Sequence, residues 1–317
     1  MNYPIHANAG AGYQAASGLS GTYIPEIWSG KLIQKFYTAT VFGSICNTDY
    51  EGEISAMGDK VKIRTVPDIV IRDYEIGQGL TYDRYRSDNV ELLIDKGKYW
   101  GFNVNKVEEK QADIKYVSKW AEDASEQLKI NIDGSILAAI PADPDADNMG
   151  ATAGKIAGNV NLGAAGTNGG SAVSLSRTTI VDKLVECGQV LTEQNVPVTN
   201  RWVVIPAWAS TRIKISELKD ASLSGDGNSM LRNGRIGRID HFEIFVSNNI
   251  SPVMEGTEPL YNLPFGHKSA TTFASQLVEN ELIPNPTDFG QLMRGLQVYG
   301  FETIKPDALG LLLAKIG

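Results

Sequence analysis

One long helical pattern dominates the distribution of apolar residues along this chain. Between residues 107 and 140, apolar side chains recur at steps of three or four, the period of a helix with one buried face. The residues expected on that face are Ile114, Val117, Ala121, Ala124, Leu128 and Ile132, followed by Ile136 and Ala139. About 28 helical residues would form a rod of roughly 42 Å. We expect this helix to be a spine along which the flanking segments are arranged.

The ends of the spine are less sharply specified than its middle. Asn105 followed by Glu108 forms a plausible capping pair, although the helix could begin as late as Asp113. Gly134 should cost about 1 kcal/mol relative to alanine, so a bend or an early stop is expected there. Charged residues of both signs, such as Lys119, Glu122 and Glu126, occupy the opposite face, which is typical of a solvated surface.

Period-two alternation before the spine predicts a long two-stranded hairpin. Residues 60–64 alternate strictly, and apolar residues resume at 69–71 after Pro67. The return arm is indicated by Leu92, Ile94, Trp100, Phe102 and Val104. Arms of about 15 residues would reach roughly 45–50 Å. A ribbon of that length is marginal alone, so it needs another surface, which could belong to a different subunit.

The other segments predict shorter elements of both kinds. Trp28, Leu32 and Phe36 repeat at intervals of four in a helix expected to open at Ile24-Pro25 and to end near Gly43. Further helices are expected at 177–194 and 207–218, strands at 201–206, 241–247, 268–275 and 296–304, and a polar loop at 219–235. Residues 141–175 are rich in Gly, Ala and Asn and predict a surface insertion. Strands and helices do not alternate regularly, so the fold class is α+β.

Composition excludes several classes of protein. The net charge of −8 argues against a protein that grips nucleic acid through a basic patch. It is compatible with a wall that surrounds nucleic acid and leaves it mobile. No apolar run approaches the ~20 residues that span a bilayer, and the N-terminal residues lack the pattern of a secretory signal. Two cysteines, Cys46 and Cys187, indicate a reducing origin without a disulfide framework.

No catalytic or metal-binding constellation is recognisable. His6, His241 and His267 are dispersed, without the spacing of a metal site. Phosphate-binding, dinucleotide-binding and nucleophile-elbow motifs are missing. The G-x-x-G at 234–237 matches the short loop of an RNA-binding KH domain, but a turn explains it better. We therefore expect no enzyme activity, no cofactor and no metal.

The order of these segments resembles the major capsid proteins of tailed double-stranded DNA bacteriophages, which share the Hong Kong 97 fold. The resemblance is carried by TYIPEIWSGKLIQKFY at 22–37, LLIDKGKYWGFNV at 92–104, ADIKYVSKWAEDASEQLKINID at 112–133 and RGLQVYGFETIKPDAL at 294–309. Collinear segments at 58–74, 201–209, 231–249 and 266–277 extend it over nearly everything after the first two dozen residues.

The resemblance implies a division of the chain into named parts. These are an N-terminal arm at 1–23, an N-terminal helix and P-domain entry at 24–57, an extended E-loop hairpin with its base at 58–104, a P-domain spine helix at 105–140, the insertion at 141–175, an axial A-domain at 176–291 and a C-terminal P-domain strand at 292–317. In this family the arm and the E-loop reach over neighbouring subunits.

The resemblance also implies a function, a set of partners and a candidate contact surface. The chain is expected to assemble into hexamers and pentamers of an icosahedral virion shell around double-stranded DNA, built in the host cytoplasm. A separate scaffolding protein, a portal and decoration proteins are the implied partners, and no membrane is involved. The residues expected to contact a neighbour at the E-loop tip are Asp73, Tyr74, Tyr82, Asp83, Arg84, Tyr85, Arg86 and Asp88.

Two alternatives remain open from the sequence. An encapsulin-type compartment uses the same fold around protein cargo, and an α+β metabolic enzyme could assemble a site from scattered residues. One feature bears on how a shell would be held together. Some capsids of this fold join an E-loop lysine to a neighbour's asparagine, yet this chain has no lysine between Lys62 and Lys96. Its arginines stay protonated and cannot act as that nucleophile, so non-covalent cohesion is expected.

Overall fold

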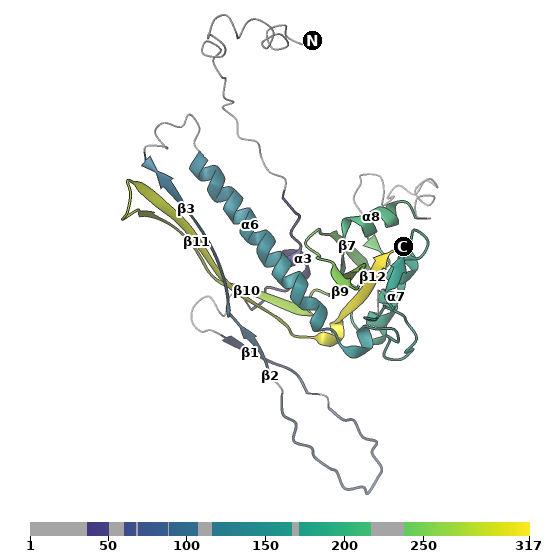
Figure 1. Ribbon diagram of the computed structural model, residues 1–317. Coiled ribbons are helices and arrows are strands. Elements are labelled where there is room, and N and C mark those ends of the chain that lie inside the picture. Colours follow the sequence, from purple (N-terminus) through teal and green to yellow (C-terminus); the bar gives the residue numbers. More distant parts are fainter. Residues whose placement is uncertain are drawn as a thin grey trace, which may run out of the picture.

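The chain folds into an extended part and a compact part, which Figure 1 displays in a computed structural model. The structure describes residues 37–50, 60–67, 69–87, 89–106, 116–166, 171–216 and 238–317. The extended part contains a long helix beside a three-stranded sheet, and the compact part surrounds a seven-stranded sheet (Figure 1). The α+β class expected from the sequence is confirmed.

The long helix α6 runs from Tyr116 to Ala139 and continues into the 3₁₀ helix η2, Ile140–Ala142. Gly134 lies inside it without ending it, which corrects the expectation of an early stop. Ile132 and Ile136 are fully buried, Leu128 is half-buried against the main core, and the side chains of Val117, Ala121 and Ala124 are half-buried. The expected start of the helix and Ile114 lie outside the described residues.

The three-stranded sheet lies along this helix. It consists of β3 (Lys96–Asn105), β10 (Thr271–Pro284) and β11 (Gly290–Thr303) in the antiparallel order β10-β11-β3. Aromatic contacts hold the helix on the sheet. The rings of Trp100 and Phe102 on β3 stack at 5.6 Å, and Phe102 meets Trp120 of α6 edge to face at 5.7 Å.

The predicted hairpin is only partly formed. Strands β1 (Lys60–Arg64) and β2 (Asn89–Leu93) pair antiparallel over five residues each, and Ile63, Leu92 and Ile94 form a small core with Ala274. The prediction that residues 100–104 pair with the first arm of the hairpin is wrong, because those residues pair with β11. Residues 69–71 are in no strand. Alternation identifies half-buried positions but does not name the partner strand.

The compact part is built on a mixed sheet in the order β4-β12-β9-β5-β7-β6, with β8 paired to β9. The strands are β4 (Val173–Leu175), β5 (Arg201–Ile205), β6 (Arg238–Ile239), β7 (Phe242–Val246), β8 (Val253–Glu255), β9 (Glu258–His267) and β12 (Leu309–Ile316). The helices are α7 (Ile180–Glu193), α8 (Ala207–Lys214) and the short η3 (Ala146–Asn148) and η4 (Pro306–Ala308).

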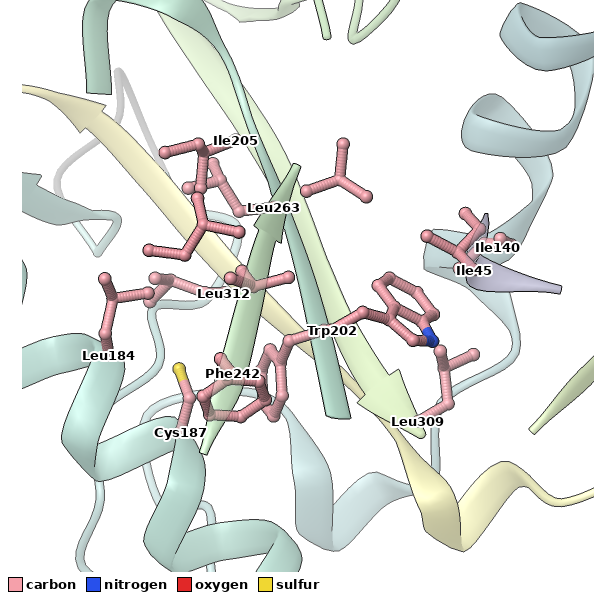
Figure 2. Packing of buried hydrophobic residues seen from close by; sticks show 14 of the residues in the cluster. Ile45, Ile140, Leu184, Cys187, Trp202, Ile205, Phe242, Leu263, Leu309 and Leu312 are labelled. Atoms are coloured by element: carbon pink, nitrogen blue, oxygen red, sulfur yellow. The ribbon is translucent and has the colours of Figure 1, made fainter. Parts of the chain in front are cut away.

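The main core joins this sheet to α7 and also includes the C-terminal end of α6 and Ile140 of η2. All five residues of β5 are buried; in Figure 2 Phe242 lies beside Leu184 and Cys187, whereas Trp202 points the other way and lies beside Leu309. Arg201 is buried at the start of β5, where its guanidinium donates to the carbonyls of Pro197, Gly188 and Val196. These bonds fasten the turn after α7 to the sheet, since a buried charge needs such partners.

A second buried charge links the two parts of the molecule. Asp133 of α6 accepts hydrogen bonds from the backbone N–H groups of Val41 and Phe42, at 2.8 and 2.9 Å. These groups lie at the start of the short helix α3, Phe42–Ile45. The other carboxylate oxygen accepts from the Asn249 side chain at 2.6 Å. One carboxylate therefore ties α3, the long helix and the turn after β7 together.

The expected surface insertion at 141–175 is exposed at residues 155–159 but contributes to the core elsewhere, which corrects the expectation in part. Val160, Leu162 and Leu175 belong to the main core, and β4 adds a parallel strand to β12. Gly163 has φ +83°, and a Cβ there would clash with the carbonyl oxygen of Leu313. Small residues in this segment thus permit a close approach to β12, so their abundance did not signal exposure.

Strand pairing also divides the C-terminal region differently from the expected domains. Residues 271–284, assigned to the A-domain, form β10 beside β11 in the extended part. Conversely, β12, assigned to the P-domain, pairs with β9 and β4 in the compact sheet. The expected arm at 1–23, most of the helix at 24–43, the loop at 219–235 and the G-x-x-G at 234–237 lie outside the described residues.

Candidate subunit interface

A long loop extends from the short hairpin and is the first candidate surface (Figure 1). It comprises residues 65–87, which we call the long loop, and all of these except residue 68 are described. At its base, Lys60 and Lys62 of β1 lie 3.6 and 3.1 Å from the carboxylate of Glu91 on β2. The hydrogen bond from Lys62 and the charge of Lys60 lower the pKa of Glu91.

Contacts between its two limbs give the long loop its shape. Arg72 forms an ion pair with Asp83 at 2.7 Å, and the Tyr85 hydroxyl accepts the backbone N–H of Val70 at 3.0 Å. At the tip, the backbone N–H of Gln78 donates to the carbonyl of Glu75, and Gly77 has φ +91°. Positive φ at the turn suits glycine, which has no Cβ to clash.

The apolar residues of the long loop face solvent in the isolated subunit. Ile76 is 97% exposed, Leu80 62% and Tyr82 87%. Further exposed apolar side chains on the loop are Val66, Ile69, Val70, Ile71 and Tyr74. Such a concentration is unusual for a monomer surface, which makes the long loop a candidate interaction site. These apolar residues are absent from the site predicted from the sequence, except for Tyr74 and Tyr82.

The predicted contact residues fall on the loop, but two of them are engaged within it. Asp73, Tyr74, Tyr82, Arg84 and Arg86 are exposed there, and Asp88 lies outside the described residues. Asp83 instead pairs with Arg72, and Tyr85 joins the two limbs. Asp83 and Tyr85 therefore shape the loop. The run of apolar residues at 69–71 was the overlooked signal, because it resembles a buried strand.

The outer face of the three-stranded sheet is the second candidate surface. Trp100 and Phe102 point toward α6, and successive side chains in a strand point to opposite faces, so Tyr99, which precedes Trp100, points away from the helix and is 83% exposed. Tyr99 lies opposite Leu296, and Leu296 lies opposite Glu279. Tyr99, Leu296, Glu279, Glu281 and Arg294 line a shallow hollow of about 370 Å³.

Charges on this outer face are already partly paired. Arg294 donates to Glu281 across the β10–β11 ladder at 2.8 Å, which lowers the pKa of that carboxyl. Glu279 is exposed beside them. The face therefore combines an aromatic ring, an aliphatic side chain and an acidic edge, a composition suited to a protein contact.

The described residues contain no cluster of three or more potential metal ligands, and no described helix has the length and apolarity to cross a membrane. Cys46 and Cys187 are both free and buried, and burial raises the pKa of Cys46 to about 12. His241 lies on the surface beside Asp240. Burial lowers the pKa of His267, whose Nδ1 accepts the N–H of Ser269.

The chain is similar to several solved structures, although no family model and no curated protein matches it. A solved structure from Mycobacterium phage Che8 shares 26% identity, with a TM-score of 0.74 over 92% of this chain and 97% of that one. The capsid of cyanophage P-SCSP1u has a TM-score of 0.71 at 14% identity, over 93% and 94% of the two chains. The mature capsid of bacteriophage PhiM1 has a TM-score of 0.67 at 13% identity, over 100% and 99%.

The chain thus has the fold of phage capsid proteins along nearly its whole length. The resemblance recognised in the sequence is confirmed at this level.

Proposed function

We propose that this chain is a major capsid protein, which assembles into hexamers and pentamers of an icosahedral shell around double-stranded DNA. The observation that carries the proposal is the long loop with its exposed apolar residues, presented by a subunit that has a capsid fold. The neighbours with this fold include capsids of cyanophage P-SCSP1u, PhiM1 and Ralstonia phage GP4. A structural role of this kind requires no catalytic residues, and we infer no enzyme activity.

The long loop of one subunit lies on the outer face of the three-stranded sheet of the next in this proposal. Burial of Ile76, Leu80 and Tyr82 supplies the apolar contact, at about 25 cal/mol for each Å² removed from water. Arg84 and Arg86 bring positive charge toward the acidic edge at Glu279. Two complementary patches on one subunit make a heterologous contact, and such contacts close into rings when the rotation fits.

The inner surface of the proposed shell faces DNA without gripping it. A net charge of −8 disfavours tight phosphate contacts and keeps the packaged polymer mobile. We infer a separate scaffolding protein, a portal and decoration proteins as partners, with assembly in the host cytoplasm.

Sedimentation velocity of the purified protein tests the proposal. We expect particles of megadalton mass at assembly conditions, in equilibrium with subunits of 34.4 kDa or small rings at low concentration. A single species at the subunit mass under every salt and concentration condition would contradict a shell function.

Cohesion between subunits is expected to be non-covalent. The lysines nearest the long loop lie at its base: Lys60 and Lys62 contact Glu91, and Lys96 contacts Asp95. Both cysteines are buried, which leaves their thiols without access to a neighbour. Boiling mature particles in detergent without reductant should therefore release monomers of 34.4 kDa in gel electrophoresis. A ladder of dimers to hexamers that survives this treatment would refute the prediction.

A further inference from the structure

A large groove lies between the first described turns of α6 and the three-stranded sheet, alongside the contact between Phe102 and Trp120. Its volume is about 1160 Å³. Trp100 and Phe102 of β3, Met293 of β11 and Trp120 of α6 provide its apolar surface, and Glu122, Asp123 and Glu126 of the helix also line it. Small-molecule pockets usually measure about 300–1,000 Å³, so a groove of this size suits a polypeptide segment.

The chain itself leads into this groove. Tyr37 lines it, and the Tyr37 hydroxyl donates to Asp123 of α6 at 2.9 Å. Four residues later, the N–H of Val41 donates to Asp133 of the same helix. Four extended residues span about 13 Å, and ten helical residues rise about 15 Å. Residues 37–41 therefore run beside α6 in the same direction, which places Tyr37 at the groove and makes residues 24–36 its neighbours in the sequence.

The residues immediately before Tyr37 have the composition that this groove requires. Trp28, Leu32 and Phe36 recur at intervals of four, which gives a helix one apolar stripe. Lys31 and Lys35 lie on the same segment and complement the acidic residues of the groove, of which Glu122 is exposed and Glu126 pairs with Lys129 at 2.8 Å. A helix that lays such a stripe into an apolar groove is a recurrent mode of peptide recognition.

We propose that residues 24–36 of the same chain occupy this groove. These residues lie outside the described part of the structure. In the docked segment, Trp28, Leu32 and Phe36 cover Trp120 and the aromatic residues of β3, while the two lysines face the acidic side chains of α6. The segment then acts as a wedge that fixes the distance between the spine helix and the sheet. This inference does not depend on the proposed shell function.

Photo-crosslinking in the full-length protein tests the docking. The photoreactive amino acid p-benzoylphenylalanine is placed at Trp28 in one variant and at Phe36 in another, with Tyr13 as the control position. Far- and near-ultraviolet circular dichroism verifies folding of each variant. Irradiated protein is digested, and mass spectrometry identifies the linked peptides. Mixing ¹⁴N- and ¹⁵N-labelled subunits distinguishes links within one chain from links between chains.

We expect both reporter positions to link to residues 100–102, 119–126, 280 or 293 of the same chain, and the Tyr13 position not to do so. Changing Lys31→Glu together with Lys35→Glu should lower the yield roughly fivefold at low salt, because two surface ion pairs are lost. Links to the groove of another chain would overturn the assignment in favour of an exchanged arm. Links from both positions to other surfaces, or no groove link in a folded variant, would overturn it as well.

Discussion

Replacing Ile76, Leu80 and Tyr82 together by serine is expected to abolish shell closure while leaving the subunit folded. All three side chains are largely exposed in the subunit, so their removal should change the free energy of unfolding by no more than about 0.5 kcal/mol each. In the proposed assembly the same side chains are buried on a neighbouring sheet. Electron microscopy should reveal dispersed subunits or small rings, and thermal unfolding should match the wild-type subunit.

Ile156→Ser is the matched control for this triple variant. Ile156 is 81% exposed but lies in the compact part, away from the long loop. It should leave both assembly and unfolding unchanged. Deleting residues 78–86 is the stronger form of the experiment, because it also removes Asp83, the partner of Arg72. Normal shells from the triple variant and the deletion would show that the long loop is not the inter-subunit element.

Asp133→Ala is expected to lower the free energy of unfolding by about 3–5 kcal/mol. The carboxylate is fully buried and accepts hydrogen bonds from Val41, Phe42 and Asn249. Alanine leaves these three donors without their partner, and each unsatisfied buried donor costs about 1–3 kcal/mol. Chemical denaturation of the subunit under non-assembling conditions measures the loss.

Two further substitutions separate the lost hydrogen bonds from other effects. Asp133→Asn keeps an oxygen that can accept from Val41 and Phe42, so it should lose less stability than alanine. Gln127→Ala, at an exposed position of the same helix that does not line the groove, should leave the free energy of unfolding nearly unchanged. Equal stability of the wild type and Asp133→Ala would mean that this carboxylate does not join the three segments.

Local patterns predicted the individual elements well, because each element repeats its own period. The helix through Leu128 and Ile132, the strand at 201–205 and the helix with Leu184 and Cys187 all lie within the predicted ranges. Side chains at these positions are buried on one face of a helix or within a sheet. The spacing of apolar residues in the sequence therefore predicts which of these side chains are buried.

Pairing between distant segments was not predictable in the same way. Alternation at Trp100 and Phe102 indicated a half-buried strand, yet either β1 or β11 could satisfy it, and the structure selects β11. The parallel addition of β4 to β12 depends on Gly163 allowing close backbone contact. A composition rich in glycine resembles a surface loop whether it is exposed or tightly packed.

The sequence predicted the location of the long loop better than it predicted which of its side chains are exposed and apolar. Polar and glycine-containing residues located the tip of the long loop, and charges suggested contacts with a neighbour. Asp83 and Tyr85 also hold the two limbs of the loop together, through Arg72 and the N–H of Val70. The exposed apolar residues, Ile76 above all, could not be distinguished from core residues, since a sequence does not state what covers a side chain.

Cryo-electron microscopy of the assembled protein tests the central claim most directly. We expect closed icosahedral shells in which density for residues 65–87 of each subunit crosses Tyr99 and Leu296 of a neighbouring copy. Dispersed subunits, or shells in which the long loop contacts only its own subunit, would contradict the account.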